Sequence, residues 1–89
     1  MATMLVQFNV QDFEAWRKVY DANTELRKTN GGISHQVFRD ASDANKVIIV
    51  NQWDSIENAQ AFARSQELRI AQDSSGVIGT PEVSFLIQA

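Results

Sequence analysis

The chain has 89 residues, the size of one domain, and a monomer of this length buries only about two-thirds or less of its unfolded surface. Its 44% hydrophobic and 21% charged residues are typical of a globular protein, and a net charge of −3 gives no basic surface for nucleic acid. The sequence has no cysteine and no stretch approaching the roughly 18 apolar residues of a membrane span. Because the start also lacks the pattern of a signal peptide, we expect a cytoplasmic protein with no membrane partner.

The first predicted elements are a strand and a long helix. Residues 4–10, MLVQFNV, alternate in a period of two and predict a strand. Asp12 is placed to cap the helix that follows, and Gly31-Gly32 is placed to end it. The apolar residues of this stretch fall within one half of a helical wheel, opposite a charged arc: Phe13, Ala15, Trp16, Val19, Tyr20, Ala22 and Leu26.

A predicted hairpin comes next. Residues 33–40 and 46–54 have the composition of strands and flank a polar loop, ASDAN, at 41–45. If Arg39 pairs with Val47, the register places Val37 opposite Ile49, His35 opposite Asn51, and Ile33 opposite Trp53. That register uses a seven-residue loop, so the pairing could also slip by two residues.

The second half of the chain predicts a helix, a loop and a strand. Asp54-Ser55-Ile56-Glu57 has the spacing of a capping box, so the helix begins there with Asp54 or Ser55 as its cap. Leu68 falls outside its apolar face, which predicts a break near Ser65, with Ser65 capping a short second segment. Residues 73–80 are expected to be a loop with Val77 and Ile78 tucked inward, and Pro81 to mark the entry of the last strand.

The order β-α-β-β-α-β predicts an α+β fold, a ferredoxin-like sandwich in which a four-stranded antiparallel sheet carries both helices on one face. The other face would expose several apolar side chains, and such a patch on one small domain is normally covered by a partner. We therefore expect a homodimer through the sheet face, with the two sheets related by a two-fold axis. The apolar residues assigned to this face are Leu5, Phe38, Ile48, Val50 and Leu86.

Three stretches carry a resemblance to a known family: VQFNVQDFEAWRKVYD, VIIVNQWDSIENAQAFARSQELR and GVIGTPEVSFL. Together they resemble the dimeric α/β-barrel superfamily, especially its antibiotic-biosynthesis-monooxygenase-like branch. That resemblance covers nearly the whole chain and implies a dimeric α/β barrel. Superfamily members include cofactor-independent oxygenases acting on aromatic polyketide-like molecules, haem-degrading enzymes, isomerases and many small uncharacterised proteins, so fold alone does not give the activity.

The haem-degrading branch implies an Asn on the first strand, a Trp on the third strand and a His on the second helix. Asn9 and Trp53 lie in comparable elements here, but residues 55–75 contain no histidine, and Asn9 is predicted to face away from the helices. We therefore reject haem degradation and expect no haem. A single histidine with scattered carboxylates also argues against a metal site.

His35, the only histidine, is the predicted catalytic residue. Strand parity places it on the helix-facing side beside Asn51, beneath Trp16 and Tyr20. An imidazole near neutral pKa could take a proton from a phenol or an acidic carbon. The alternative is a buried structural histidine that hydrogen-bonds to Asn51 or to a main-chain carbonyl.

Five residues are predicted to bind substrate: Asn51, Tyr20, Trp16, Arg27 and Trp53. For Trp16 and Tyr20 the alternative is ordinary core packing, because aromatic stripes at helical spacing dominate cores. Arg27 could bind an anionic ligand group, or could simply favour the helix dipole from the last turn. Trp53 could contact a ligand or anchor the corner before the second helix.

The sequence thus favours a small-molecule enzyme resembling cofactor-independent monooxygenases or isomerases, with an apolar or aromatic substrate held between sheet and helices. This interpretation requires open space there; if Trp16, Phe62 and Phe85 filled it, the site would be lost. The alternative is a non-catalytic dimeric module that binds a metabolite or a partner protein.

Overall fold

The structure is a computed structural model that describes residues 2–89. Four strands and four short helices follow one another along the chain. They are β1 (Ala2–Val10), α1 (Phe13–Ala22), α2 (Thr24–Thr29), β2 (Gly32–Asp40), β3 (Asp43–Trp53), α3 (Ile56–Ala63), α4 (Gln66–Ser74) and β4 (Val77–Leu86).

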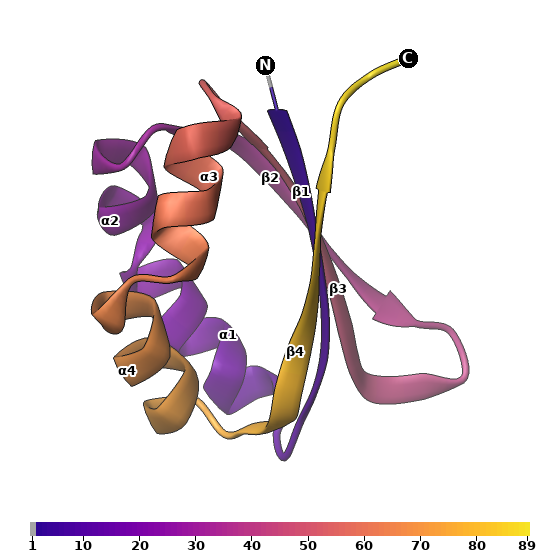
Figure 1. Cartoon of the computed structure of the whole chain (residues 1–89). Coiled ribbons are helices and arrows are strands. Elements are labelled where there is room, and N and C mark those ends of the chain that lie inside the picture. The colour runs from indigo at the N-terminus through magenta and orange to yellow at the C-terminus, as the bar shows by residue number, and fades with distance from the viewer. Residues whose placement is uncertain (1) are drawn as a thin grey trace.

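The four strands form one antiparallel sheet in the order β2-β3-β1-β4. This order places the two strands that follow the helical regions, β2 and β4, at opposite edges. All four helices cover one face of the sheet, and the β2–β3 hairpin projects beyond them (Figure 1). The predicted ferredoxin-like β-α-β-β-α-β sandwich is confirmed, as the right-handed crossover rule requires.

The core lies between the sheet and the helices. On β1 every second residue is buried, from Ala2 through Val10, because alternate side chains of a strand point to the same face. The central strand β3 shows the same alternation from Val47 to Trp53. Trp16 of α1 and Phe62 of α3 pack onto this surface from the helical layer.

The first helical region is broken, contrary to the single helix predicted between Asp12 and Gly31. The break is at Asn23, whose side-chain Nδ2 donates to the Val19 carbonyl at 2.8 Å and whose backbone N–H bonds to Tyr20 O. Asparagine side chains commonly compete for helix backbone groups in this way. The predicted cap is confirmed, because Asp12 Oδ1 accepts a hydrogen bond from Glu14 N at 3.0 Å.

The second helical region breaks where the sequence predicts. Ser65 Oγ accepts a hydrogen bond from Leu68 N at 3.2 Å and so caps α4. The cap of α3 is Ser55, which accepts from Asn58 N at 3.1 Å. Asp54 is therefore not the cap; its carboxylate instead accepts from Asn58 Nδ2 at 2.8 Å.

The hairpin register agrees with the predicted one at three positions. Arg39 pairs with Val47, Val37 with Ile49, and His35 with Asn51. The predicted pairing of Ile33 with Trp53 is wrong, because an irregularity between Gly32 and Ser34 places Gly32 opposite Trp53 instead. The loop is also shorter than residues 41–45, because a second irregularity lets Asp40 pair with Asp43.

The predicted loop at residues 73–80 is largely absent. Helix α4 continues to Ser74 and β4 begins at Val77, which pairs with Val10 of β1. Ile78 is exposed rather than tucked inward. Pro81 lies inside β4 rather than at its entry, and there the pairing with β1 is interrupted between Gln7 and Asn9, as expected for proline on an edge strand.

The sheet face opposite the helices carries the apolar residues that the sequence assigns to it. Phe38 and Leu86 are 48% and 44% exposed, and Leu5, Ile48 and Val50 are partly exposed beside them.

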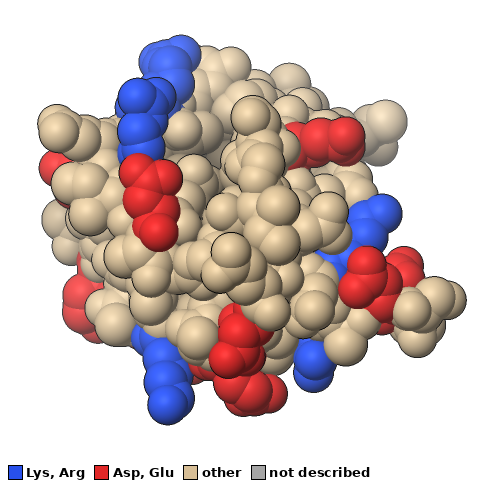
Figure 2. Space-filling view, turned by 90° about the horizontal axis from the view of Figure 1, so that it is seen from below, with Lys and Arg blue, Asp and Glu red and all other residues tan. Residues whose placement is uncertain are grey.

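The end of the molecule seen from below in Figure 2 carries scattered charges of both signs, with uncharged surface between them. This view therefore contains no broad basic patch.

Candidate functional site

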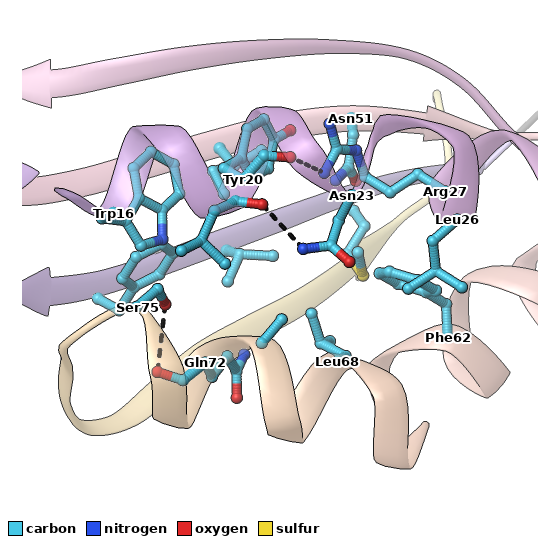
Figure 3. A pocket seen from close by; sticks show the side chains of 16 residues that line it. Trp16, Tyr20, Asn23, Leu26, Arg27, Asn51, Phe62, Leu68, Gln72 and Ser75 are labelled. Atoms are coloured by element: carbon cyan, nitrogen blue, oxygen red, sulfur yellow. Dashed lines mark hydrogen bonds between the residues drawn. The ribbon is translucent and has the colours of Figure 1, made fainter. Parts of the chain in front are cut away.

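A cavity of about 70 Å³ lies between the sheet and the helices. Its walls are almost entirely apolar, with Met4, Val6, Phe8 and Ile49 from the sheet and Trp16, Leu26, Phe62 and Leu68 from the helices. Figure 3 shows α1 and α2 on one side of this space and α4 on the other. Trp16 and Phe62 thus line the space without closing it.

Tyr20 contributes a buried polar atom to this region. Its hydroxyl oxygen has no hydrogen-bond partner among residues 2–89. Burial raises the pKa of the Tyr20 phenol, although the nearby Arg27 opposes that shift. The phenol is therefore protonated at neutral pH and can donate a hydrogen bond to a ligand.

Arg27 is 8% exposed and lies against Tyr20. Its guanidinium carbon is 3.7 Å from the centre of the Tyr20 ring, a cation–π arrangement. Nη1 donates to the Tyr20 carbonyl at 2.9 Å (Figure 3). Nη2 donates to Thr24 Oγ1 at 3.2 Å. Arg27 thereby joins the end of α1 to α2, and burial lowers its pKa without threatening its charge.

A row of aromatic rings leads from the cavity toward β2. Trp16 stacks on Tyr20 with ring centres 4.9 Å apart, and Tyr20 and His35 form a T-shaped pair with ring centres 5.4 Å apart. Stacked and edge-to-face geometries are those that aromatic quadrupoles favour. His35 therefore lies at the outer end of this row.

Asn51 and Trp53 form a buried hydrogen-bonded pair on β3. Trp53 Nε1 donates to Asn51 Oδ1 at 2.9 Å, and the two residues are 0% and 5% exposed, Trp53 being the more buried. Asn51 thus bonds to Trp53 rather than to His35, its cross-strand neighbour. The expected alternative of a buried histidine held by Asn51 does not describe this structure, since His35 is exposed.

A second hollow of about 200 Å³ opens beside the cavity, between α2 and the start of β2. It contains His35 and Trp53, and its other walls include Thr24, Lys28 and Ser34. Partial burial, followed by the positive charge of Arg27, lowers the pKa of His35 from its ordinary value. The imidazole is therefore neutral at physiological pH and can accept a proton.

The six predicted site residues are divided between these two spaces. Trp16 and Tyr20 line the apolar cavity, His35 and Trp53 line the hollow, and two residues, Arg27 and Asn51, line both. Sequence reasoning missed the far wall of the cavity, made by Leu68, Ala71, Gln72 and Ser75 of α4 and its end. The sequence indicates that Leu68 and Ala71 share an apolar face, but it does not show that this face lies against the cavity.

The sequence of residues 1–74 matches the family described as antibiotic biosynthesis monooxygenase. The chain belongs to this family. A comparison with curated proteins gives no match.

Solved structures of antibiotic biosynthesis monooxygenases share the fold of this family member. A putative one from Bordetella bronchiseptica superimposes with a TM-score of 0.81 at 13% identity, covering 99% of this chain and 96% of the other. SnoaB from Streptomyces nogalater, a cofactor-independent oxygenase, gives 0.80 at 12% identity and covers 99% and 92%. A putative monooxygenase from Caulobacter crescentus gives 0.78 at 15% identity and covers 99% and 89%. At these identities the likeness concerns the fold alone.

Within residues 2–89, no three His, Asp or Glu side chains lie close enough together to hold a metal ion. In the same part of the chain, no helix is long and apolar enough to cross a membrane.

Proposed function

We propose that this family member is a small-molecule enzyme that resembles cofactor-independent monooxygenases or isomerases and binds an apolar or aromatic substrate between sheet and helices. The observation that carries the proposal is the apolar cavity bordered by a few polar groups, which is the usual form of a small-molecule site. The likeness to SnoaB, a cofactor-independent oxygenase, supports the same class of chemistry.

Each predicted residue has a role in this proposal. Trp16 provides the flat wall against which a ring packs. Tyr20 and Asn51 orient the substrate by hydrogen bonds, and Arg27 stabilises negative charge that develops on it. Trp53 holds the amide of Asn51 in place through its indole N–H.

His35 is the proposed base. Its neutral imidazole suits removal of a proton from a phenol or an acidic carbon, and its position beside Tyr20, in the hollow next to the cavity, supports this role. A proton removed there leaves an oxyanion or carbanion within the field of Arg27. No step of this proposal passes through a metal or haem.

We also infer that the working unit is a homodimer through the sheet face. The helices cover only one face of the sheet (Figure 1). The exposed apolar residues of the opposite face, among them Phe38, would be covered by a second copy. Face-to-face sheets related by a two-fold axis bring identical surfaces together. The surface of a chain of 89 residues favours such burial, because a small monomer is marginally stable.

A second candidate is a non-catalytic dimeric module that binds a metabolite or a partner protein. The favouring observation is that His35 does not line the apolar cavity, so a ring bound deep inside would lie away from the base. In that case the cavity would bind a molecule without changing it.

Isotope labelling separates these functions. The protein is incubated with a panel of one-ring and two-ring phenols, in one arm under ¹⁸O₂ and in the other in D₂O, and the products are analysed by mass spectrometry. Incorporation of ¹⁸O from oxygen supports the monooxygenase class, and enzyme-dependent deuterium exchange without ¹⁸O supports the isomerase class. Binding with neither label favours the non-catalytic module, and a His35→Ala variant with full turnover removes His35 from the mechanism.

A further inference from the structure

We propose that the hollow beside Arg27 binds the oxyanion of an aromatic ligand, while the ring of the same ligand lies in the adjoining apolar cavity. This proposal rests on the proposed function and names the chemical class of its substrate: an aromatic molecule that carries a carboxylate or a phenolate. The three observations behind it are the charges that line the hollow, the burial of Arg27 and the continuity of the two spaces.

The hollow is lined by positive and neutral groups only. Arg27, Lys28 and His35 all contribute to its walls, and no aspartate or glutamate does. This is a local excess of positive charge in a chain whose net charge is −3. A concave surface of one sign concentrates ligands of the opposite sign.

Arg27 forms no ion pair with a carboxylate among residues 2–89, although Asp21 lies near enough to oppose the lowering of its pKa. The two ion pairs in that part of the chain are Arg17 with Asp21 at 3.1 Å and Lys28 with Glu25 at 3.9 Å, both between exposed side chains. A charge as buried as that of Arg27 normally lies beside a counter-charge, because the loss of hydration is costly. An anionic ligand would supply that counter-charge.

The hydrogen bonds of Arg27 leave donors for a ligand. Two of its nitrogens bond to the Tyr20 carbonyl and to Thr24 Oγ1, whereas a guanidinium carries five N–H donors. One face of the guanidinium is covered by the Tyr20 ring, so the donors lie around its edge. This fork geometry matches the oxygens of a carboxylate.

The hollow and the cavity meet at Arg27 and Asn51, which line both. Because an indole N–H can only donate, Asn51 must turn its Oδ1 toward Trp53, and its NH₂ group points elsewhere as a donor. A single ligand could thus place a ring against Trp16 and an oxyanion against Arg27. A purely structural role for Arg27 at the end of α1 explains its hydrogen bond to the Tyr20 carbonyl. That role does not explain why no acidic residue lines the hollow.

Binding of matched probes to the wild-type protein tests this proposal. Phenylacetate, neutral phenylacetamide and cationic 2-phenylethylamine share one ring and one short arm, and each is titrated while the indole N–H signals of Trp16 and Trp53 are followed by NMR. Phenylacetate should bind at least about tenfold more tightly than phenylacetamide, as expected for a hydrogen-bonded charge pair. That advantage should shrink with added salt. Equal affinities for the anion and the amide would overturn the proposal.

Variants locate the site. Arg27→Gln should remove most of the preference for phenylacetate, and Lys28→Gln should reduce it about twofold, whereas Lys18→Gln on the exposed side of α1 should leave it unchanged. If Arg27→Gln fails to fold, the Lys28→Gln result and the probe preference of the wild type decide the question. A preference that survives in folded Arg27→Gln would contradict the assignment.

The source of the oxyanion is distinguished by adding pentafluorophenolate to the probes. Tighter binding of phenylacetate indicates a carboxylate ligand, and tighter binding of the phenolate indicates a phenol that ionises in the site. The proposal and the proposed function can fail separately. Anion-selective binding without isotope incorporation would support the anion site and contradict the enzymatic function. Turnover of neutral substrates without a preference for anions would support the enzymatic function and contradict the anion site.

Discussion

Trp53 Nε1 donates a 2.9 Å hydrogen bond to Asn51 Oδ1 inside the protein, where neither side chain has appreciable contact with water. This pair fixes the orientation of the Asn51 amide at the boundary between the apolar cavity and the hollow beside Arg27. Both residues belong to β3, so the bond lies within the last part of that strand. Its loss should affect both stability and ligand binding.

Replacing Asn51 should leave a buried donor without a partner. Asn51→Ala is expected to lower the free energy of unfolding by about 1–3 kcal/mol, because the Trp53 indole N–H would be buried and unsatisfied. Urea denaturation monitored by circular dichroism measures this. Asn58→Ala, which removes an exposed amide–carboxylate bond to Asp54, is the control and should cost less than about 0.5 kcal/mol. Equal losses in both variants would show that the buried bond has no special weight.

Removing the Tyr20 hydroxyl should not destabilise the protein. Tyr20→Phe keeps the ring on Trp16 and beneath Arg27 but deletes a buried oxygen that has no partner among residues 2–89. We expect the free energy of unfolding to stay equal or to rise by up to about 1 kcal/mol. Tyr20→Leu, which also removes the stacking, should lower it. A loss in Tyr20→Phe of more than about 1 kcal/mol would mean that the hydroxyl makes a stabilising bond.

The titration of His35 should report its burial and the charge of Arg27. Its pKa lies below the usual value of about 6.5, so ¹H–¹⁵N NMR should find a lower midpoint. Arg27→Gln should move the midpoint upward but not fully back, because burial is the larger cause. Lys18→Gln serves as the control and should not change it. A midpoint above 6.5 in the wild type would contradict this account.

The same shift sets the sign of a pH effect on stability. Below about pH 6.5 the unfolded chain takes up a proton at His35 before the folded chain does, so stability falls as the pH drops toward the folded-state pKa. The effect should be small because His35 is exposed. Denaturation midpoints at several pH values should therefore show a weaker slope in His35→Gln than in the wild type, and an unchanged slope would assign the effect to other groups.

The uncovered sheet face should control association. Phe38→Glu is expected to shift the proposed dimer toward monomer in sedimentation experiments, because a carboxylate would be buried in an apolar interface. Ile70→Glu on α4 alters a residue of similar size that is even more exposed, at 59%, and should leave the sedimentation unchanged. A wild-type protein that sediments as a monomer at micromolar concentration would contradict the dimer outright.

Helix α4 should be the least protected element of the cavity wall. It contains no fully buried residue, although Leu68 packs against the core from it. Ser65→Ala removes its cap and should cost about 1 kcal/mol locally. Hydrogen exchange should accelerate at residues 66–74 more than in β1 or β3. Uniform acceleration across the whole chain would instead place α4 within the global folding unit.

The fold could be predicted because its pattern is strong in the sequence. Period-two strands and two amphipathic helical regions in a fixed order are compatible with few topologies. Ser65 could be predicted as a cap because a serine hydroxyl accepts a hydrogen bond from a backbone N–H at the start of a helix. The break at Asn23 could not be predicted in the same way. Asparagine is tolerated within helices, and only the bonds to Val19 and Tyr20 carbonyls reveal that it ends one.

The six residues of the candidate site could be chosen from the sequence, but their division between the cavity and the hollow could not be predicted. The predicted hairpin register correctly placed His35 opposite Asn51, yet β2 is an edge strand, so the helical layer leaves His35 exposed. Parity gives the face of a sheet and not how far the helices extend across it. The wall formed by α4 required the tertiary packing of a segment distant in sequence.

The account depends most on an open apolar cavity between sheet and helices, and xenon binding tests this most directly. Apolar cavities stay dry and bind xenon, as an engineered cavity of about 150 Å³ does in another protein. A crystal structure of this chain under xenon pressure should place xenon among Trp16, Ile49 and Phe62 with these side chains in their present positions. A structure in which those side chains close the space and no xenon binds would contradict the account.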